Sequence, residues 1–391
     1  MTEICSDQSW SLFEWPFFEK KHHDLAHRVS AWAKAAAVRE EPENFNSHCQ
    51  SIVPSLGKAG FLEAVVPSEG VPFDVRSLCV IREALTYEDA LFDAMFTMQG
   101  IGTLAIQRHG SPAQKERYLP PCRDGSQVAA FALTEPEGGS DVAATATTAT
   151  RTDDGWVIEG EKTLISNAGF ADHYLVVART GEAPGARGLS VFIVDADNEG
   201  LKCGEPIDFI AEHPAAPVSF HECRVPREAL VGEAGKGFAV AMGAFDIFRP
   251  SVGAASVGLA RRAMGEALRH VRKRELFGNV MGELQGVQMM LADMACDVDT
   301  AALAVYRAAW VHDVRGDASP YVSSMAKLVA SEAAGRVADK AVQLLGGAGV
   351  TRGNLVEKLY REARAMRIYE GASEVQKLIV GRGLSRGKAR P

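Results

Sequence analysis

The sequence predicts a mainly α-helical protein with a β domain in its middle. Apolar residues recur at helical spacing over residues 1–127, short apolar runs between turn residues replace this pattern over 128–232, and helical spacing returns over 233–391. We therefore expect an N-terminal helical domain, a central antiparallel β domain and a C-terminal four-helix bundle with these bounds. A chain of 391 residues agrees with several domains, because a single hydrophobic core rarely serves that length.

Composition excludes several classes of protein. The net charge of −8 provides no basic surface for nucleic acid, and no apolar run is long enough to span a membrane. The first 14 residues lack the basic and apolar pattern of a signal peptide. The seven cysteines are scattered without a Cys-x-x-Cys pair, which is typical of a reduced, cytoplasmic protein without a metal framework.

The N-terminal domain contains four stretches with helical periodicity. The expected helices cover 17–39, 49–59, 75–87 and 92–109. His23 and His27 are four residues apart, as helical metal ligands can be, but charged neighbours and the lack of a second ligand pair favour a solvated face. Pro112 and the Pro120-Pro121 pair mark the end of the helical region.

Strand signals fill the central domain. The Asp154-Gly155 pair predicts a hairpin, and the apolar runs that follow the first strand have the length and spacing of a compact antiparallel sheet. The expected strands lie at 128–133, 156–159, 174–178, 189–194 and 218–220.

The last third predicts a helical bundle. The expected helices cover about 238–273, 282–314, 320–347 and 354–369. One stripe at spacings of three and four is typical of a bundle core rather than of a binding motif. It consists of Leu291, Met294, Val298, Ala301 and Val305.

Four segments combine glycines, hydroxyls or an arginine in ways that suit a ligand. Residues 134–141 and 160–168 follow strands, and their hydroxyls and amides can donate hydrogen bonds where glycine lets a ligand approach the backbone. Residues 343–349 are glycine-rich but follow a helix, so they are not a Rossmann fingerprint. In 274–278 an arginine is placed to pair with phosphate. Taken alone, residues 134–141 could be only an irregular turn, because glycine and serine are common in turns.

Glu370 is the candidate general base. It stands between Tyr369 and Gly371, where the glycine is expected to end the last helix and to aim the carboxylate. In a dry cleft the loss of water would raise its pKa toward the range that a base needs. A solvated carboxylate at a helix end is the alternative.

Taken in order, these segments resemble the acyl-CoA dehydrogenase family over nearly the whole chain, and its short- and medium-chain branch most closely. The first family signature is matched by Leu133-Thr134-Glu135-Pro136 and Gly139-Ser140-Asp141. The second is matched by Gln343, Gly346-Gly347, Gly349, Lys358, Glu362 and Ile368-Tyr369-Glu370-Gly371. Further matches are 245–250, 274–278 and 291–294.

The resemblance implies the family fold, with a barrel-like β domain, and FAD bound between that domain and the C-terminal bundle. The residues implied to meet the flavin are Phe131, Leu133, Thr134, Gly139, Ser140, Ile165 and Ser166. Those implied to bind the dinucleotide part, on a neighbouring subunit's FAD, are Arg274, Phe277, Gln285, Gln343 and Gly347. Ser373 and Glu374 adjoin the cofactor site. A homodimer or homotetramer is therefore expected.

The resemblance also implies a reaction. Glu370 would remove the α proton of an acyl thioester while hydride leaves the β carbon for flavin N5, which yields the enoyl thioester. The residues implied to face the substrate are Ser140, Asp246, Arg249 and Gly371. The backbone N–H of Glu370 and a flavin ribose hydroxyl would hold the thioester carbonyl. The family's alternative base position holds Phe248, which cannot accept a proton.

Four positions depart from the family pattern: Leu164 replaces a tryptophan over the flavin, Glu137 a small residue, Ala372 a threonine and Gly353 an acidic residue. These departures suit a specialised biosynthetic member, with the acyl group on CoA or on an acyl carrier protein. Leu164 leaves electron-transfer flavoprotein in doubt as the electron-accepting partner. Two alternatives stay open: a flavin-dependent oxidase or monooxygenase on the same scaffold, and a non-catalytic flavoprotein scaffold.

Overall fold

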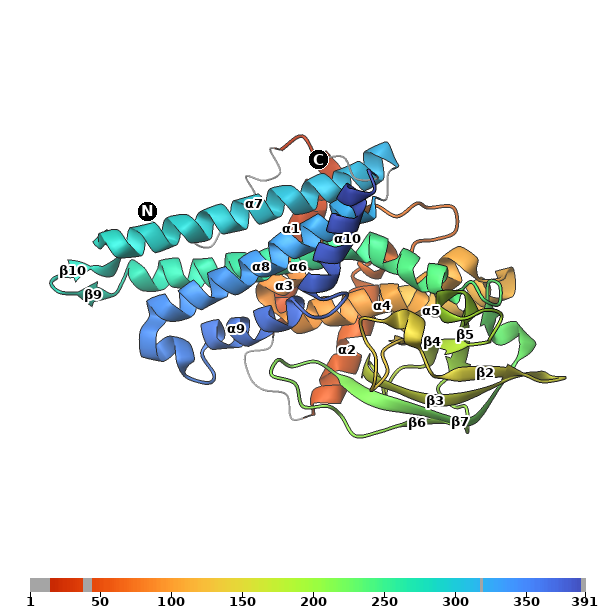
Figure 1. The fold of residues 1–391 in the computed structure, drawn as a ribbon. Helices are drawn as coiled ribbons and strands as arrows, with labels where there is room; N and C mark the ends of the chain where they lie inside the picture. Colours follow the sequence, from red (N-terminus) through yellow and green to blue (C-terminus); the bar gives the residue numbers. More distant parts are fainter. Residues whose placement is uncertain (1–14, 38–43, 317–318, 388–391) are drawn as a thin grey trace. The chain divides into compact units, whose positions relative to one another are not determined.

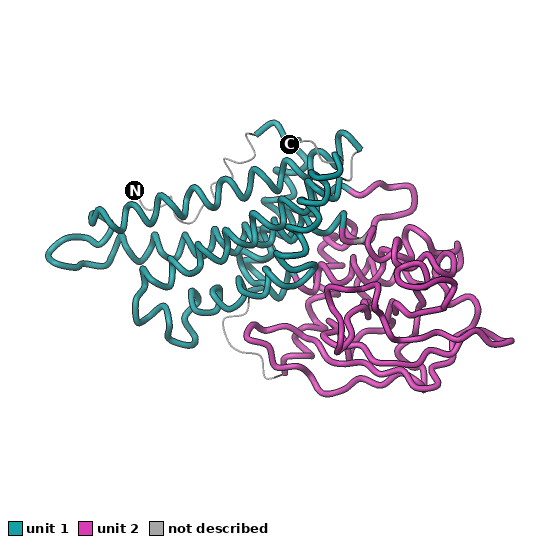
Figure 2. Tube along the Cα trace, viewed as in Figure 1, with its two compact units in different colours: residues 1–37, 74–93, 246–391 teal, residues 38–73, 94–245 magenta. Residues whose placement is uncertain are grey.

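The computed structural model describes residues 15–37, 44–316 and 319–387, and it confirms the predicted fold class (Figure 1). Contacts divide the chain into two compact units (Figure 2). Unit 1 comprises Met1–Ala37, Asp74–Asp93 and Asp246–Pro391, and unit 2 comprises Val38–Phe73 and Ala94–Phe245. The division into three segments along the chain stays a prediction. Residues 1–14 and the predicted helix end at 38–39 lie outside the described residues.

Unit 1 is built from long helices. They are α1 (Lys20–Ala36), α3 (Val75–Glu88), α6 (Gly237–Val271, in this unit from Asp246), α7 (Gln285–Arg315), α8 (Pro320–Leu345), α9 (Leu355–Met366) and α10 (Ser373–Ser385). A small hairpin of β9 (Glu275–Leu276) and β10 (Asn279–Val280) joins α6 to α7. The four predicted C-terminal helices are present, and α10 is a fifth that the sequence pattern did not indicate.

Small residues let the helices of unit 1 approach closely. The predicted stripe on α7 is buried at Met294, Val298, Ala301 and Val305, while Leu291 packs at the edge of the core. A Cβ added to Gly258 of α6 would lie 2.2 Å from the carbonyl oxygen of Glu83, so α3 and α6 touch backbone to backbone. Close packing of this kind fixes the positions of side chains that the helices carry inward.

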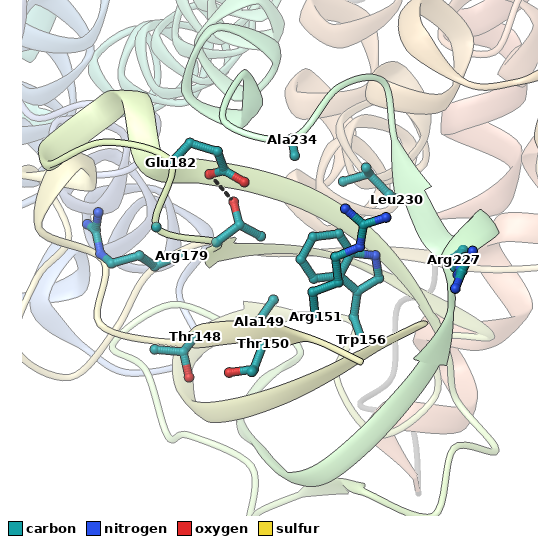
Figure 3. Close-up of a pocket in the computed structure, with 12 residues that line it drawn as sticks. Thr148, Ala149, Thr150, Arg151, Trp156, Arg179, Glu182, Arg227, Leu230 and Ala234 are labelled. Carbon is teal, nitrogen blue, oxygen red and sulfur yellow. Dashed lines mark hydrogen bonds between the residues drawn. The ribbon is translucent and has the colours of Figure 1, made fainter. Parts of the chain in front are cut away.

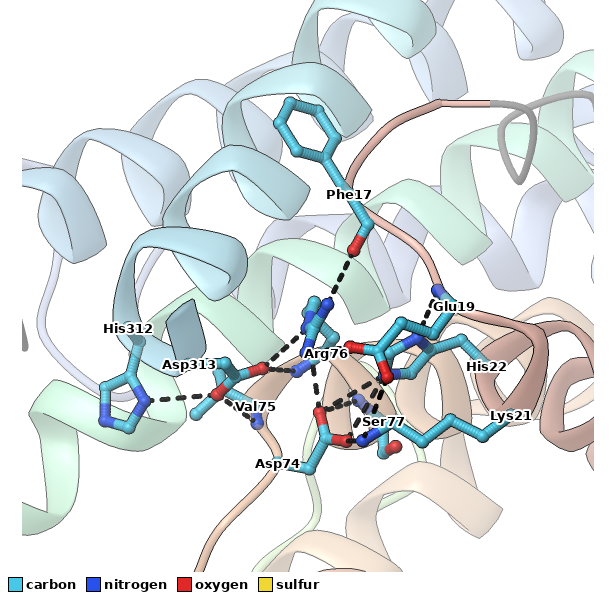
Figure 4. A network of polar contacts seen from close by, with 10 residues as sticks. All are labelled: Phe17, Glu19, Lys21, His22, Asp74, Val75, Arg76, Ser77, His312 and Asp313. Atoms are coloured by element: carbon cyan, nitrogen blue, oxygen red, sulfur yellow. Dashed lines mark hydrogen bonds and ion pairs between the residues drawn. The ribbon is translucent and has the colours of Figure 1, made fainter. Parts of the chain in front are cut away.

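A polar network ties α1 and α7 to the start of α3 (Figure 4). Asp74 caps α3 through the Ser77 amide at 3.1 Å and also meets Lys21 at 2.5 Å. Asp313 of α7 accepts from the backbone amides of Val75 and Arg76, each at 2.9 Å, and from Arg76 Nε at 3.0 Å. The start of α3 is therefore held from two sides by carboxylates.

Unit 2 combines helices with a mixed sheet. The helices are α2 (Phe45–Lys58), α4 (Ala90–His109, in this unit from Ala94) and α5 (Pro112–Asp124). The prolines predicted to end the helical region instead lie within α5. Pro112 takes the first helical turn, where its missing N–H costs nothing, and Ser111 and Gln114 form a capping box.

The sheet of unit 2 has eight strands. They are β1 (Ala129–Ala132), β2 (Thr148–Arg151), β3 (Gly155–Ser166), β4 (His173–Arg179), β5 (Leu189–Asp195), β6 (Leu201–Cys203), β7 (Ala215–Pro226) and β8 (Leu230–Val231). The order is β6-β7-β3-β2-β4-β5-β8, with β1 also pairing with β4. Most pairings are antiparallel as predicted, but β1 and β2 each run parallel to β4. Within the described residues, no helix is long and apolar enough to cross a bilayer.

Replacing Asp313 should destabilise unit 1. Asp313→Ala would leave Arg76 Nε and two backbone amides without this acceptor, while Glu19 and the Phe17 carbonyl would still engage Arg76. We therefore expect a loss of about 2–3 kcal/mol in the free energy of unfolding. Asp297→Ala is the matched control on the same helix, because Asp297 pairs with Arg336, whose side chain is 52% exposed. That change should cost at most about 1 kcal/mol. Equal losses in denaturant unfolding would contradict the assigned role of Asp313.

Candidate functional site

Glu370 lies in the turn between α9 and α10 rather than at the end of a helix. The helix predicted over 354–369 is α9, which ends at Met366. Both Glu370 (φ 50°) and Gly371 (φ 93°) adopt left-handed backbone conformations. A non-glycine residue with such a φ is strained, so its surroundings must hold it there. The Gly371 carbonyl accepts from Lys327 Nζ at 2.9 Å and from Gln376 Nε2 at 2.8 Å.

The carboxylate of Glu370 is enclosed but not saturated with hydrogen bonds. Its side chain is only 10% exposed, and Oε2 is buried without a hydrogen-bond partner among the described residues. Arg82 of α3 places its NH1 3.9 Å from Glu370 Oε1. A buried, unsatisfied carboxylate oxygen is costly in a core and is typical of a group that acts on a ligand.

Burial raises the pKa of Glu370, while Arg82, Lys327 and Arg249 act in the opposite direction. The net direction is upward, which is the direction that a general base working near neutrality needs. Burial also lowers the pKa of Lys327 to about 8, against the attraction of Glu370. The two groups are thus coupled in one low-dielectric environment.

The predicted substrate residues Asp246 and Arg249 form an ion pair on α6. Arg249 NH1 lies 3.1 Å from Asp246 Oδ1, and Arg249 is 7% exposed. Burial lowers the Arg249 pKa, opposed by Asp246 and Glu370. The structure therefore brings Arg249 into the electrostatic environment of Glu370. Ser373, at the start of α10, donates to Glu332 at 2.6 Å, and Glu374 is exposed.

The predicted dinucleotide residues lie elsewhere in unit 1, at the β9–β10 hairpin, the start of α7 and the end of α8 (Figure 1). They are exposed, and they comprise Arg274, Phe277, Gln285, Gln343 and Gly347. Phe277 is 90% exposed at φ 55°, so the hairpin holds an aromatic ring in solvent. A Cβ added to Gly347 would meet open space, so a ligand can reach the backbone there.

In unit 2, a buried ion pair shapes the segment predicted to meet the flavin. Lys162, which is fully buried, donates to Glu135 Oε1 at 2.8 Å and to the Leu133 carbonyl at 3.0 Å. Glu135 also accepts from the amides of Ala146 and Thr147 at 2.6 and 2.9 Å. The loop is therefore anchored at one residue.

The surface of that loop is left open. Gly139 and Ser140 are exposed, Phe131, Leu133 and Thr134 are half-buried, and a Cβ on Gly139 would meet only Thr134 Cγ2 at 3.6 Å.

The end of β3 carries the second predicted flavin segment. Leu164 has φ 58° at a register shift and is 49% exposed, while its neighbour Ile165 is buried. Ser166 Oγ lies 2.7 Å from His213 Nε2, and burial lowers the His213 pKa to about 4. The strand thus presents Leu164 outward at the position where the resemblance expected a tryptophan.

Sequence reasoning missed three charged residues around Glu370. Arg82, Asp93 and Lys327 are all buried, and each interrupts a largely apolar helical stretch. Charged residues are almost never fully buried unless they are paired, so this interruption was the available signal.

A pocket of about 620 Å³ opens on the sheet of unit 2, and none of the predicted site residues lines it (Figure 3). Arg151, Arg179 and Arg227 give it a cationic lining. Arg179 is occupied by the carbonyls of Ala143, Thr145 and Gly185, and Arg227 by that of Asp153. Two of these arginines therefore serve to hold loops.

Acid should weaken unit 2 through Glu135. Burial raises its pKa, but the hydrogen bonds from Ala146, Lys162 and Thr147 outweigh burial and hold the pKa at about 2, below the ordinary 4.5. Because the folded-state pKa is depressed, this stabilisation is complete above about pH 4.5 and is lost as pH falls toward 2.

The difference in unfolding free energy between the native protein and Glu135→Gln should therefore shrink over that window. Glu137→Gln removes an exposed carboxylate of the same loop and serves as the control. A Glu135→Gln difference independent of pH would contradict the assignment.

Comparison with known proteins places the chain in a family. Models of the acyl-CoA dehydrogenase N-terminal, middle and C-terminal domains match residues 19–126, 130–223 and 235–385. Cyclohex-1-ene-1-carbonyl-CoA dehydrogenase of Syntrophus aciditrophicus (strain SB) is 37% identical over 90% of this chain and 86% of that protein.

Solved structures agree. A glutaryl-coenzyme A dehydrogenase bound to glutaryl-CoA has a TM-score of 0.89 and 29% identity over 95% of this chain and 96% of its own. The FAD complex of PigA has a TM-score of 0.86 and 25% identity over 94% and 98%. The chain therefore belongs to the acyl-CoA dehydrogenase family of flavin-dependent oxidoreductases.

Proposed function

We propose that the protein oxidises an acyl-CoA to the enoyl-CoA, with FAD as cofactor and Glu370 as the base that removes the α proton. The observation that carries this proposal is the Glu370 carboxylate itself. It is buried, its Oε2 has no hydrogen-bond partner among the described residues, and burial raises its pKa. A carboxylate left in this state within a family of dehydrogenases is suited to accept a proton from carbon.

The residues of each unit fit FAD. In unit 2 the open loop around Gly139 and Ser140 offers backbone and hydroxyl donors that a flat ring system can approach. In unit 1 the exposed Arg274 and the open Gly347 suit a pyrophosphate. Bound FAD would supply the redox step by taking up the hydride that leaves the β carbon. We further propose that the exposed dinucleotide residues serve the FAD of a second subunit in a homodimer or homotetramer.

The residues of the chain orient the substrate and move the proton. The Glu370 carboxylate would receive the α proton at Oε2, and its backbone N–H would donate to the thioester carbonyl. Asp246 and Arg249 would line the same region. The Syntrophus relative is named for a CoA substrate, which favours CoA over an acyl carrier protein. We also propose that the protein is cytoplasmic and that electron-transfer flavoprotein is its electron acceptor.

The purified protein should be yellow and contain about one FAD per chain. Arg274→Ala should lose much of this flavin, because an exposed guanidinium that pairs with phosphate would be removed. Arg272→Ala changes another arginine of the same segment and serves as the control. The measurement is the flavin absorbance per chain, together with sedimentation to relate flavin content to oligomeric state. Colourless protein that takes up no added FAD would contradict the proposal.

Glu370→Gln should separate binding from chemistry. The amide keeps the shape of the side chain and the backbone N–H but accepts no proton from carbon, so substrate should still bind. Anaerobic bleaching of the flavin by an acyl-CoA should slow by about 10²–10⁴-fold, as is typical of losing a positioned base. Asp339→Asn changes an exposed carboxylate of α8 that belongs to no assigned site, and it should bleach at the native rate. Bleaching of Glu370→Gln at nearly the native rate would place the base elsewhere.

A further inference from the structure

Arg82, a buried arginine near Glu370, is held by hydrogen bonds at all three nitrogens of its guanidinium group. Its Nε and NH2 donate to the two oxygens of Asp93 at 2.7 and 2.9 Å, a bidentate geometry, and its NH1 donates to Ser251 Oγ at 2.8 Å. The side chains of Arg82 and Asp93 are 2% and 5% exposed. Three helices, α3, α4 and α6, therefore fix one guanidinium group.

The same guanidinium faces the base. NH1, the nitrogen that Ser251 orients, lies 3.9 Å from Glu370 Oε1, which is too long for a hydrogen bond but close for a charge interaction. At this separation in a buried environment the attraction is far stronger than in water. Glu370 Oε2 remains without a partner among the described residues, so Arg82 attracts the carboxylate without covering the oxygen that would take the proton.

We propose that Arg82, held by Asp93 and Ser251, is a positioning residue that keeps the Glu370 carboxylate ionised and turned so that Oε2 stays available. This inference rests on the proposed role of Glu370 as the base. It adds to that role a buried ion pair, Arg82 with Asp93, whose cation also attracts the Glu370 carboxylate from 3.9 Å.

Among the charged groups that act on Glu370, Arg82 has the largest influence. Burial raises the Glu370 pKa most strongly, and Arg82 is the largest opposing influence, ahead of Lys327; Asp93 raises the pKa and Arg249 lowers it. Lys327 is also engaged with the Gly371 carbonyl, and Arg249 with Asp246. Tyr369, the neighbour on the same turn, is itself influenced by Arg82. Without Arg82, the buried carboxyl group would retain its proton to higher pH.

The test removes the charges of the pair and leaves polar side chains in their place. Arg82→Gln with Asp93→Asn deletes both charges, so no unpaired carboxylate is left buried beside the base. Arg82→Lys keeps the positive charge but loses the bidentate fork. The matched control is Arg261→Gln with Glu83→Gln. Glu83 of α3 is buried, lies 2.9 Å from the partly buried Arg261 and accepts a hydrogen bond from Tyr306.

Two readouts are measured on the FAD-loaded protein. The first is pH-difference infrared spectroscopy of the protonated carboxyl band that disappears in Glu370→Gln, which reports ionisation of Glu370 without turnover. The second is the pH dependence of anaerobic flavin bleaching. The double variant should move both midpoints upward by about 1 pH unit, the lower end of the effect of a cation at this distance, because the loss of Asp93 offsets part of the loss of Arg82. Below the midpoint, bleaching should slow about ten-fold for each unit. Arg82→Lys keeps the charge and should show little of this shift, and the control pair should show none.

The outcomes separate this proposal from the proposed function. An infrared midpoint that stays unchanged in the double variant would overturn the role of Arg82, whatever the role of Glu370. An infrared midpoint that moves while the bleaching profile does not would support the electrostatic action of Arg82 but contradict Glu370 as the base. Equal shifts in the control pair would show a general loss of packing and would also overturn the proposal.

Discussion

A buried carboxylate persists in a folded protein only where neighbouring charges and dipoles replace the water that it has lost. Unit 1 meets this constraint at Glu370 with cations from three helices, Arg82 on α3, Arg249 on α6 and Lys327 on α8. Two of these cations have acidic partners of their own, Asp93 and Asp246. Charges of alternating sign therefore surround the carboxylate, which limits the cost of burying each one.

This arrangement depends on backbone geometry as much as on charge. The turn that carries Glu370 contains two consecutive residues with left-handed φ, and Lys327 and Gln376 hold its last carbonyl. The helices that bring the cations inward pack closely because Gly258 lets α6 touch the backbone of α3. A larger residue at that position would separate the helix that carries Arg82 from the helix that carries Arg249 and Ser251.

Unit 2 also pairs buried charges, Lys162 with Glu135, and this pair holds a loop in place. Lys162 is fully buried, and burial lowers its pKa, so its charge is retained through Glu135 and the Leu133 carbonyl. Glu135 in turn fixes two amides on the far side of the loop. The rigid part of the loop is thus internal, and the residues that a flat ligand could approach, Gly139 and Ser140, remain exposed. A preformed surface of this kind lowers the ordering cost of binding.

Local properties of the chain were readable from the sequence. Helical and alternating periodicity depend only on neighbouring residues, and they correctly predicted helices, then strands, then a helical bundle. The motif around Glu370 is local as well, so the candidate base was named before its environment was known. The sequence pattern did not predict two helices. In α5, Pro112 takes the first helical turn, but Pro120 and Pro121 lie within the helix, and α10 contains glycines.

The tertiary structure alone decided which charges surround Glu370. Arg82 and Asp93 lie 11 residues apart on α3 and α4, but Arg249 and Lys327 come from helices far along the chain. No periodicity marks the four residues as neighbours. The sequence by itself determined that a carboxylate stands near the C-terminus with a glycine after it, and it predicted a helix end there. Whether that carboxylate is dry, and which cations oppose its burial, depends on long-range packing, because desolvation and charge interactions are set by distance in space and not by position along the chain.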